Sequence, residues 1–208
     1  MARMTPVIDQ LIDQLLEEKH LIAPSRIEIL DTMAEYIRKR SKSKRNTNLV
    51  YICTHNSRRS QIAQIWSHTA SVAFQFHGCT SLSGGTEVTA FFPSAIQAMK
   101  TLGFSIESSS GSSPNPVYDV HVGEQTPSIS CYSKKYEDAV KSIDDFAAIM
   151  TCSDADVHCP VIPGAEKRIP LTYNDPKHFD ETDQQKSAYL KTAVHIGREI
   201  LYVFNKAL

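Results

Sequence analysis

The chain begins with two segments in which apolar residues recur every three or four positions, as on one face of an α-helix. In residues 5–18 these are Val7, Ile8, Leu11, Ile12, Leu15 and Leu16. Thr5 and Pro6 suit the N-cap and the first turn of this helix. The sequence SRIE at residues 25–28 resembles a capping box that opens the second helix. We therefore predict a helical hairpin over residues 1–40.

After this hairpin, short apolar runs alternate with segments of helical periodicity. The apolar runs predict strands at residues 49–53, 72–78 and 146–152, and the periodic segments predict helices at residues 60–70, 93–103 and 187–208. Residues 107–118 are rich in Ser, Gly and Pro and predict a loop. The alternation favours an α/β fold with a parallel sheet.

The hairpin and the sheet are joined by a basic, serine-rich stretch at residues 38–48, which we interpret as a solvated linker. About 40 residues make a poor independent core. Two interpretations of the hairpin therefore stay open, since it can pack on the rest of the chain or form the contact of a homodimer.

Composition restricts the classes of function. The 208 residues are 41% hydrophobic and 22% charged with a net charge of −1, which is ordinary for one medium-sized globular domain with an appendage and gives no support for nucleic-acid binding. The sequence has no apolar run near the roughly 18 residues that span a membrane and no signal-peptide pattern at its start. We expect a cytoplasmic protein with reduced thiols. Five cysteines, an odd number, weigh against a static disulfide framework.

The strand at residues 49–53 ends on Cys53 and leads directly into a predicted helix. A short loop from a strand into a helix N-terminus directs several backbone N–H groups at one point and binds anions. Arg59 adds a planar fork that matches tetrahedral oxyanions such as phosphate or arsenate. The same positive field favours the thiolate of Cys53, Ser60 can donate a hydrogen bond to it, and Asn56 tolerates the left-handed backbone of a tight loop.

The stretch CTHNSRRS at residues 53–60 resembles the C-x5-R-S loop of the low-molecular-weight tyrosine phosphatase superfamily. The resemblance implies a catalytic role for Cys53, Arg59 and Ser60. It also implies an anion-binding set made of Thr54, His55, Asn56, Ser57, Arg58 and Arg59. The alternative is a buried cysteine beside two surface arginines.

Further along the chain, Cys152 and Cys159 form a pair similar to the redox pair of the thioredoxin-coupled arsenate reductases, which share the phosphatase fold and loop. In both groups a late Asp-Pro dipeptide supplies the general acid, a role that falls by position to Asp175. The resemblance covers residues 49–208, which it makes the catalytic domain. It implies a central, mostly parallel four-stranded sheet flanked by helices. Residues 1–48 remain as an N-terminal helical extension with its linker.

The resemblance implies an arsenate reductase. Cys53 attacks arsenate while Asp175 protonates the departing oxygen, Cys152 then attacks Cys53 and releases arsenite, and Cys159 takes over the disulfide. Reducing As(V) to As(III) needs two electrons, which a thiol pair supplies when it forms a disulfide. We expect no tightly bound cofactor and no metal. The external reductant is a thiol, and the intramolecular Cys152–Cys159 pair favours thioredoxin over mycothiol or glutathione.

Four other interpretations stay open. A low-molecular-weight tyrosine phosphatase would hydrolyse phosphomonoesters with Cys53, Arg59 and Asp175 and would not need the cysteine pair. A binding module would hold the anion without turnover. Cys152 and Cys159 could also be inert buried thiols, or could bind Zn²⁺ together with His158.

Some residues depart from the family pattern. His55 stands where glycine is usual, and Arg58 stands where many relatives carry a second loop cysteine. Gln64 replaces the acid through which some reductases bind potassium, so we do not carry that ion site over. Cys79 and Cys131 match no motif; we expect the first to be a packing residue and the second to lie exposed in a polar loop.

Overall fold

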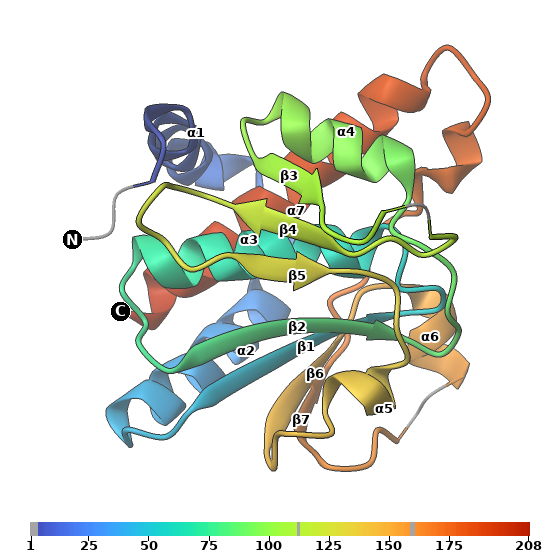
Figure 1. The fold of residues 1–208 in the computed structure, drawn as a ribbon. Coiled ribbons are helices and arrows are strands. Elements are labelled where there is room, and N and C mark those ends of the chain that lie inside the picture. The colour runs from blue at the N-terminus through green and yellow to red at the C-terminus, as the bar shows by residue number, and fades with distance from the viewer. Residues whose placement is uncertain (1–3, 112, 159–160) are drawn as a thin grey trace.

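The computed structural model describes residues 4–111, 113–158 and 161–208 (Figure 1). The helices are α1 Pro6–Glu17, α2 Pro24–Lys42, α3 Arg59–Ala73, α4 Pro93–Thr101, α5 Tyr136–Ala139, α6 Ser153–His158 and α7 Gln185–Ala207, with short 3-10 helices η1 Glu18–Leu21 and η2 Pro176–Phe179. The strands are β1 Thr47–Cys53, β2 Cys79–Gly85, β3 Ser105–Ser108, β4 Tyr118–His121, β5 Ile129–Cys131, β6 Phe146–Met150 and β7 Ala165–Ile169.

The central sheet has four strands in the order β2-β1-β6-β7, and every neighbouring pair is parallel. The predicted fold class is therefore confirmed. In the register of β1 with β2, Cys53 lies opposite Gly85. Because the strands are parallel, their carboxyl ends meet at one edge of the sheet, which is where α/β sheets bind ligands. Cys53 stands at that edge.

Both faces of the sheet are covered, which explains why β1 is apolar without alternation. Leu49 and Tyr51 point into the larger core, which α2, α3 and α7 share. Val50 and Ile52 point to the opposite face and pack in a smaller core with residues of α5 and α6. Figure 1 shows these two short helices on the side of the sheet away from α3 and α7.

The N-terminal hairpin packs on α7 and contributes buried residues to the larger core (Figure 1). Arg26 of α2 donates to both carboxylate oxygens of the buried Glu199 in α7, at 2.9 and 2.7 Å. Arg198 of α7 donates to Glu18 at 2.6 Å. The hairpin is confirmed, and these contacts favour packing within the chain. A homodimer through the same helices stays a prediction.

The predicted linker at residues 38–48 is wrong. Helix α2 continues to Lys42, and β1 already begins at Thr47. Lys44 has a φ of +54° and closes the turn between them. The basic residues therefore belong to the last turns of a helix and a tight connection.

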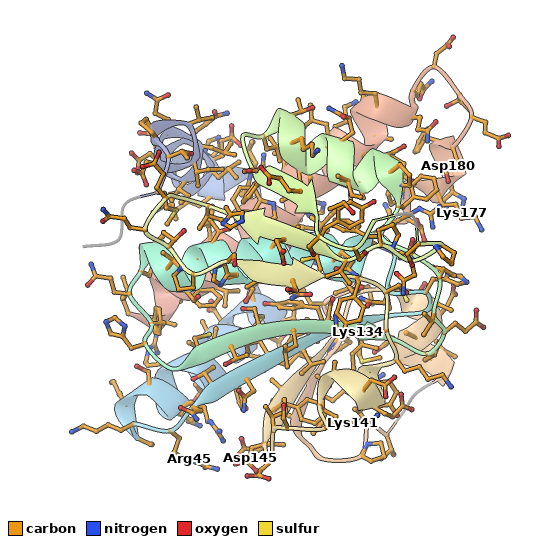
Figure 2. The ribbon with its side chains drawn as sticks, in the orientation of Figure 1. Arg45, Lys134, Lys141, Asp145, Lys177 and Asp180 are labelled. Carbon is orange, nitrogen blue, oxygen red and sulfur yellow. The ribbon has the colours of Figure 1, made fainter. Side chains whose placement is uncertain are left out.

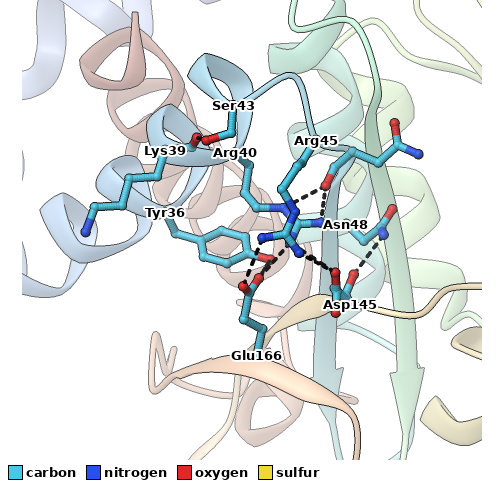
Figure 3. Close-up of polar contacts among 9 residues, drawn as sticks. Tyr36, Lys39, Arg40, Ser43, Arg45, Asn48, Asp145 and Glu166 are labelled. Carbon is cyan, nitrogen blue, oxygen red and sulfur yellow. Dashed lines mark hydrogen bonds and ion pairs between the residues drawn. The ribbon is translucent and has the colours of Figure 1, made fainter.

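Charge pairing explains why this basic segment is ordered (Figure 3). Arg40 is only 6% exposed and donates to Glu166 at 2.8 Å, while Arg45 donates to Asp145 at 2.6 Å. Tyr36 also donates to Glu166. The two acids stand at the starts of β6 and β7, so the cluster fixes α2 to the sheet edge opposite Cys53.

Two local predictions near the helix ends are also wrong. The alternating residues 72–78 form the end of α3 and a turn with Gln75 and Gly78 at φ +57° and +76°, and the second strand follows at β2. The proposed capping box is absent, because α2 starts at Pro24 with no capping side chain. Thr5, by contrast, caps α1 as predicted and accepts from Ile8 N.

A second, antiparallel sheet of β3, β4 and β5 was not predicted. It lies alongside α3 and carries Cys131 at the end of β5, buried rather than exposed. Burial raises the pKa of Cys131 to about 12, and it raises the pKa of Cys79 to about 12 as well. The expectation of an exposed Cys131 is wrong, and both thiols are packing residues.

None of the helices described in the structure is long and apolar enough to cross a membrane.

Gly197 allows α7 to approach α3. A Cβ at this position would lie 2.4 Å from Cε2 of the fully buried Trp66, whose indole donates to Ala193 O. We predict that Gly197→Ala lowers the free energy of unfolding by about 1–3 kcal/mol through overpacking, although alanine is the better helix former. Urea denaturation measures this. A Trp66→Phe background should reduce the loss, and equal losses in both backgrounds would contradict the packing argument.

Glu199 makes stability depend on acid pH. Burial alone would raise the pKa of Glu199, but hydrogen bonds from Arg26 and His195 hold it at about 2, below its usual 4.5. Because the folded-state pKa is the lower one, this carboxylate stabilises the fold above pH 4.5 and loses its contribution as the pH falls towards 2. The difference corresponds to about 3 kcal/mol.

We predict that Glu199→Gln lowers the free energy of unfolding by about 3 kcal/mol at pH 7 and that the gap to wild type closes between pH 4.5 and 2. Urea titrations across this range measure it. Glu28→Gln, on an exposed position of α2, serves as the control and should follow wild type. A gap that stays constant with pH would contradict the account.

Candidate active site

The loop between β1 and α3 presents its backbone N–H groups to a single point because its carbonyls are bound on the outside. The carbonyl oxygens of four consecutive residues accept hydrogen bonds from outside the loop: Thr54 from Glu87 N (2.8 Å), His55 from Ser133 Oγ (2.9 Å), Asn56 from Gln61 Nε2 (3.0 Å) and Ser57 from Phe92 N (2.9 Å). Within the described residues, no group accepts from the N–H groups of residues 55–58. Such a nest of free donors at a helix start is an anion site.

Asn56 holds the shape of this loop from within. Its φ of +46° is the left-handed conformation predicted for it. Its side chain accepts from Lys134 N at 3.0 Å and donates to Ser60 Oγ at 2.9 Å. Asn56 is fully buried, so this side chain acts as an internal brace rather than as a ligand to the anion.

The hydrogen bond between Ser60 and Cys53 has a direction. Ser60 Oγ lies 3.0 Å from Cys53 Sγ, and it accepts from Asn56 Nδ2. Because Asn56 already supplies a proton to this oxygen, the serine hydroxyl is free to donate its own to the sulfur. The network therefore directs a hydrogen-bond donor at the Cys53 sulfur.

Arg59 and Asp175 meet at the mouth of the loop. Arg59 Nη2 donates to Asp175 Oδ2 at 2.5 Å, and Nη1 donates to Tyr173 O at 2.7 Å. The buried Nε of Arg59 has no partner among the described residues, so it remains available to an acceptor held in the loop. Cys53, Arg59 and Asp175 line one small cleft.

The structure brings Cys152 beside the same loop. The bond from Thr151 N to Ile52 O continues the pairing of β6 with β1, and Cys152 Sγ lies 3.6 Å from Thr54 Oγ1. The sulfur is buried and accepts from Ala155 N in the first turn of α6, at 3.3 Å.

Cys159 lies outside the described residues, as does its neighbour Pro160. The proposed redox pair and the alternative zinc site with His158 therefore rest on the sequence. Elsewhere in the described chain, no group of three or more His, Cys, Asp or Glu side chains is arranged to hold a metal.

His55 and Arg58 stand at the rim of the cleft. His55 Nε2 lies 3.3 Å from Glu87 Oε2. Arg58 is turned towards Asp180, to which it donates at 2.9 Å. Its guanidinium is therefore paired with an acid, which weakens the prediction that Arg58 binds the anion directly.

Sequence reasoning missed the residues that support the loop. A Cβ on Gly85, at the end of β2, would lie 2.6 Å from Thr54 O and 2.7 Å from Asn56 N. The doublet Gly84-Gly85 at a strand end was a visible signal of such close approach. No sequence signal pointed to Ser133 or Lys134, which reach the loop across 78 residues.

Gln64 is buried on α3 and accepts from Ser83 Oγ in β2. This neutral pair joins the helix to the sheet behind the loop. We therefore assign Gln64 a structural contact at the position where some reductases carry an acid.

The described residues form an α/β fold in which a loop with the geometry of an anion site follows the first strand of the parallel sheet. Among solved structures with this architecture, a YwlE mutant from Bacillus subtilis has a TM-score of 0.50 at 12% identity and covers 77% of this chain and 97% of its own. A low-molecular-weight phosphotyrosine phosphatase from Vibrio cholerae has a TM-score of 0.49 at 15% identity, covering 76% and 94%.

In sequence, the chain is similar to arsenate reductases. One from Staphylococcus epidermidis is 28% identical over 149 residues, 70% of this chain and 92% of the relative. One from Bacillus subtilis is 27% identical over 148 residues, 70% and 86%. The predicted resemblance to the arsenate reductases is thereby confirmed. No family model matches the chain.

The close approach of Gly85 to the loop gives a test of the site. We predict that Gly85→Ala displaces the loop and weakens phosphate binding by about 10- to 100-fold, because small displacements of a bound group cost that much. Isothermal titration with phosphate measures it. Thr80→Ala, an exposed position of the same strand, should bind like wild type. Equal affinity of both variants would show that the contact is unimportant.

Proposed function

We propose that this protein is an arsenate reductase that uses Cys53 as its nucleophile. The observation that carries the proposal is the position of Cys152, a second buried thiol beside the loop that holds Cys53. An anion loop with one cysteine suits phosphoryl transfer as well as arsenate chemistry. A neighbouring thiol that can form a disulfide with Cys53 supplies the electrons that reduce arsenic.

In the first step, arsenate binds to the N–H groups of the loop and to Arg59. The Cys53 thiolate attacks arsenic, an S–As bond forms, and an As–O bond breaks. Asp175 in its protonated form donates to the departing oxygen, which leaves as water. Asp175 and the anion compete for Arg59 Nη2, so anion binding requires the Asp175 carboxyl to turn from the guanidinium towards this oxygen.

In the second step, the Cys152 thiolate attacks the Cys53 sulfur. An S–S bond forms, and the electron pair of the broken S–As bond stays on arsenic, which leaves as arsenite, As(III). Cys159 then attacks Cys152, which frees the Cys53 thiolate and leaves a Cys152–Cys159 disulfide. Two thiols lose two electrons, and arsenic gains two.

An external thiol restores the cycle, and thioredoxin is the reductant that the proposal favours. A dithiol can open an intramolecular disulfide and become a disulfide itself. The proposed relay needs no nucleic acid, membrane or tightly bound cofactor. The predicted cytoplasmic location suits a reducing thiol supply.

A phosphomonoesterase is the second candidate. The cleft that joins Cys53, Arg59 and Asp175 favours it equally, since phosphate and arsenate have the same shape and charge. Its phosphocysteine intermediate would be hydrolysed by water, and Cys152 would have no part in the reaction.

Serine variants of the cysteines distinguish the two candidate functions. We predict that Cys53→Ser abolishes both thioredoxin-dependent arsenate reduction and hydrolysis of p-nitrophenyl phosphate. Cys152→Ser and Cys159→Ser should abolish reduction and leave hydrolysis within about twofold, because only the relay needs their sulfurs. Coupled oxidation of NADPH by thioredoxin reductase measures the first activity, and release of p-nitrophenolate measures the second.

Cys131→Ser is the matched control, because that thiol is buried in the second sheet and has no part in the proposed relay. It should keep both activities. Arsenate reduction at the wild-type rate by Cys152→Ser would contradict the relay. Loss of hydrolysis in the same variant would indicate that Cys152 supports the fold of the loop instead.

A further inference from the structure

Two consecutive arginines of the loop bind the two ends of one short segment. Arg59 pairs with Asp175 at 2.5 Å, and Arg58 pairs with Asp180 at 2.9 Å. Between these acids lie only the four residues of η2. Figure 2 shows Asp180 and Lys177 on the side of the molecule towards which β1 and β2 run. Arg59 has a role in the proposed reaction, whereas Arg58 and Asp180 have none so far.

Arg58, Asp180 and Tyr189 form a closed ring of hydrogen bonds, which we call the Arg58 ring. Arg58 donates through Nε to Tyr189 Oη at 2.7 Å and through Nη2 to Asp180 Oδ2 at 2.9 Å. Tyr189 donates to Asp180 Oδ1 at 2.6 Å. Each member therefore contacts the other two.

The ring packs against Phe92 and is well shielded from solvent. The Arg58 guanidinium lies over the Phe92 ring at 4.0 Å, and Phe92 stacks in turn on Tyr189 with ring centroids 5.6 Å apart. The side chains of Arg58 and Asp180 are 12% and 20% exposed. Arg58 makes one hydrogen bond to Asp180 and one to Tyr189, and a charge pair that is this well shielded is stronger than an exposed one.

Tyr189 acts as a fixed donor in the ring. Burial and its hydrogen bond to Asp180 raise the pKa of Tyr189 well above the usual value. Its hydroxyl therefore stays protonated and donates to the carboxylate at any pH at which the protein functions. Tyr189 belongs to α7 and is completely buried, so it connects Asp180 to the main helical layer.

The short helix η2 between the two acids connects Asp175 to the Arg58 ring. Asp175 caps η2 by accepting from Lys177 N at 3.0 Å, and Asp180 follows directly after the last turn and donates through its own N–H to Lys177 O. Pro176, the first residue of η2, is buried. A four-residue turn held at its end by the Arg58 ring leaves its first residue little freedom.

The attachment of this segment to the Arg58 ring becomes important when the anion binds. Asp175 depends on Arg59 Nη2 for its position, and the proposed reaction gives that donor to the oxyanion. Without a second attachment, the segment would lose its contact with the loop at the moment when the acid is needed. Arg58, adjacent in sequence, holds the far end of the segment throughout.

We propose that Arg58, Asp180 and Tyr189 are positioning residues that hold Asp175 over the leaving oxygen during catalysis. This inference rests on the proposed function, in which Asp175 is the general acid. It replaces the predicted role of Arg58 as a direct ligand of the anion. The Arg58 ring acts on the rate of the step that Asp175 catalyses and leaves anion affinity unchanged.

A double-mutant cycle tests the proposal. Asp180→Asn removes the charge of the ring with little change in shape, and Asp175→Asn removes the acid. We expect Asp180→Asn to lower the single-turnover rate of arsenate-dependent thiol loss about tenfold, and Asp175→Asn about 100-fold. Because Asp180 acts only through Asp175, the double variant should be no slower than Asp175→Asn. The Kd for phosphate, measured by isothermal titration, should stay within twofold in Asp180→Asn.

The matched control is Asp183→Asn, an exposed carboxylate just beyond the segment, which should match wild type. If circular dichroism shows that Asp180→Asn is unfolded, Tyr189→Phe serves as a milder second variant, because it removes only the hydroxyl that joins Tyr189 to Arg58 and Asp180. It should be slowed about threefold and show the same non-additivity with Asp175→Asn. A full tenfold loss in the Asp175→Asn background, or a phosphate Kd weakened in parallel with the rate, would overturn the positioning role.

Failure of the proposed function gives a different result. If wild type loses no thiols with arsenate but hydrolyses p-nitrophenyl phosphate, the relay is wrong, and the same cycle on ester hydrolysis still tests the Arg58 ring. Phenyl phosphate makes the hydrolysis experiment more sensitive to Asp175, because its poorer leaving group depends more on protonation by the acid. Asp180→Asn should slow phenyl phosphate more than p-nitrophenyl phosphate, and equal slowing would overturn the inference.

Discussion

The outward bonding of four consecutive carbonyls in residues 54–57 is the constraint on which the site depends. A peptide unit whose oxygen accepts a hydrogen bond from an outside partner turns its N–H the other way, and here that direction is the space in front of Cys53. The partners come from the segment after β2, from α3 and from the connection after β5. Gly85 lets the first of these approach closely, since any side chain there would meet the loop backbone. Contacts from outside the loop therefore determine the geometry of its anion site.

Once this anion site exists, the neighbouring side chains select its chemistry. In the proposed reaction, the chain of hydrogen bonds from Asn56 through Ser60 reaches Cys53, the nucleophile. Arg59 and Asp175, which line the same cleft, are the proposed clamp and acid for a tetrahedral oxyanion. Cys152, buried beside the loop, is the thiol that the proposal requires for reduction. The parallel pairing of β1 with β6 brings these two thiols to the same edge, because both follow the carboxyl ends of adjacent strands.

Local sequence patterns predict much of the fold and of the candidate site. The features that they miss depend on contacts between residues far apart in the chain. The strand that ends at Cys53, the loop, and the helix after it follow from periodicity and from the residue types that bind anions. The basic stretch was misjudged because charge suggests solvent, whereas Arg40 is buried against acids more than 100 residues away. Residues 72–78 alternate like a strand, yet their aromatic side chains pack from a helix end and a turn. Ser133 and Asp180 gain their roles only through long-range contacts, which a single sequence does not encode in any local signal.

The most direct test of the central claim is a count of thiols and products in one turnover without reductant. Reduced protein is mixed with one equivalent of arsenate, and free thiols, arsenite and disulfide-linked peptides are measured after quenching. The account predicts one arsenite and two thiols lost for each chain, with the disulfide between Cys152 and Cys159. Unchanged thiols, or a disulfide that excludes Cys152, would contradict it.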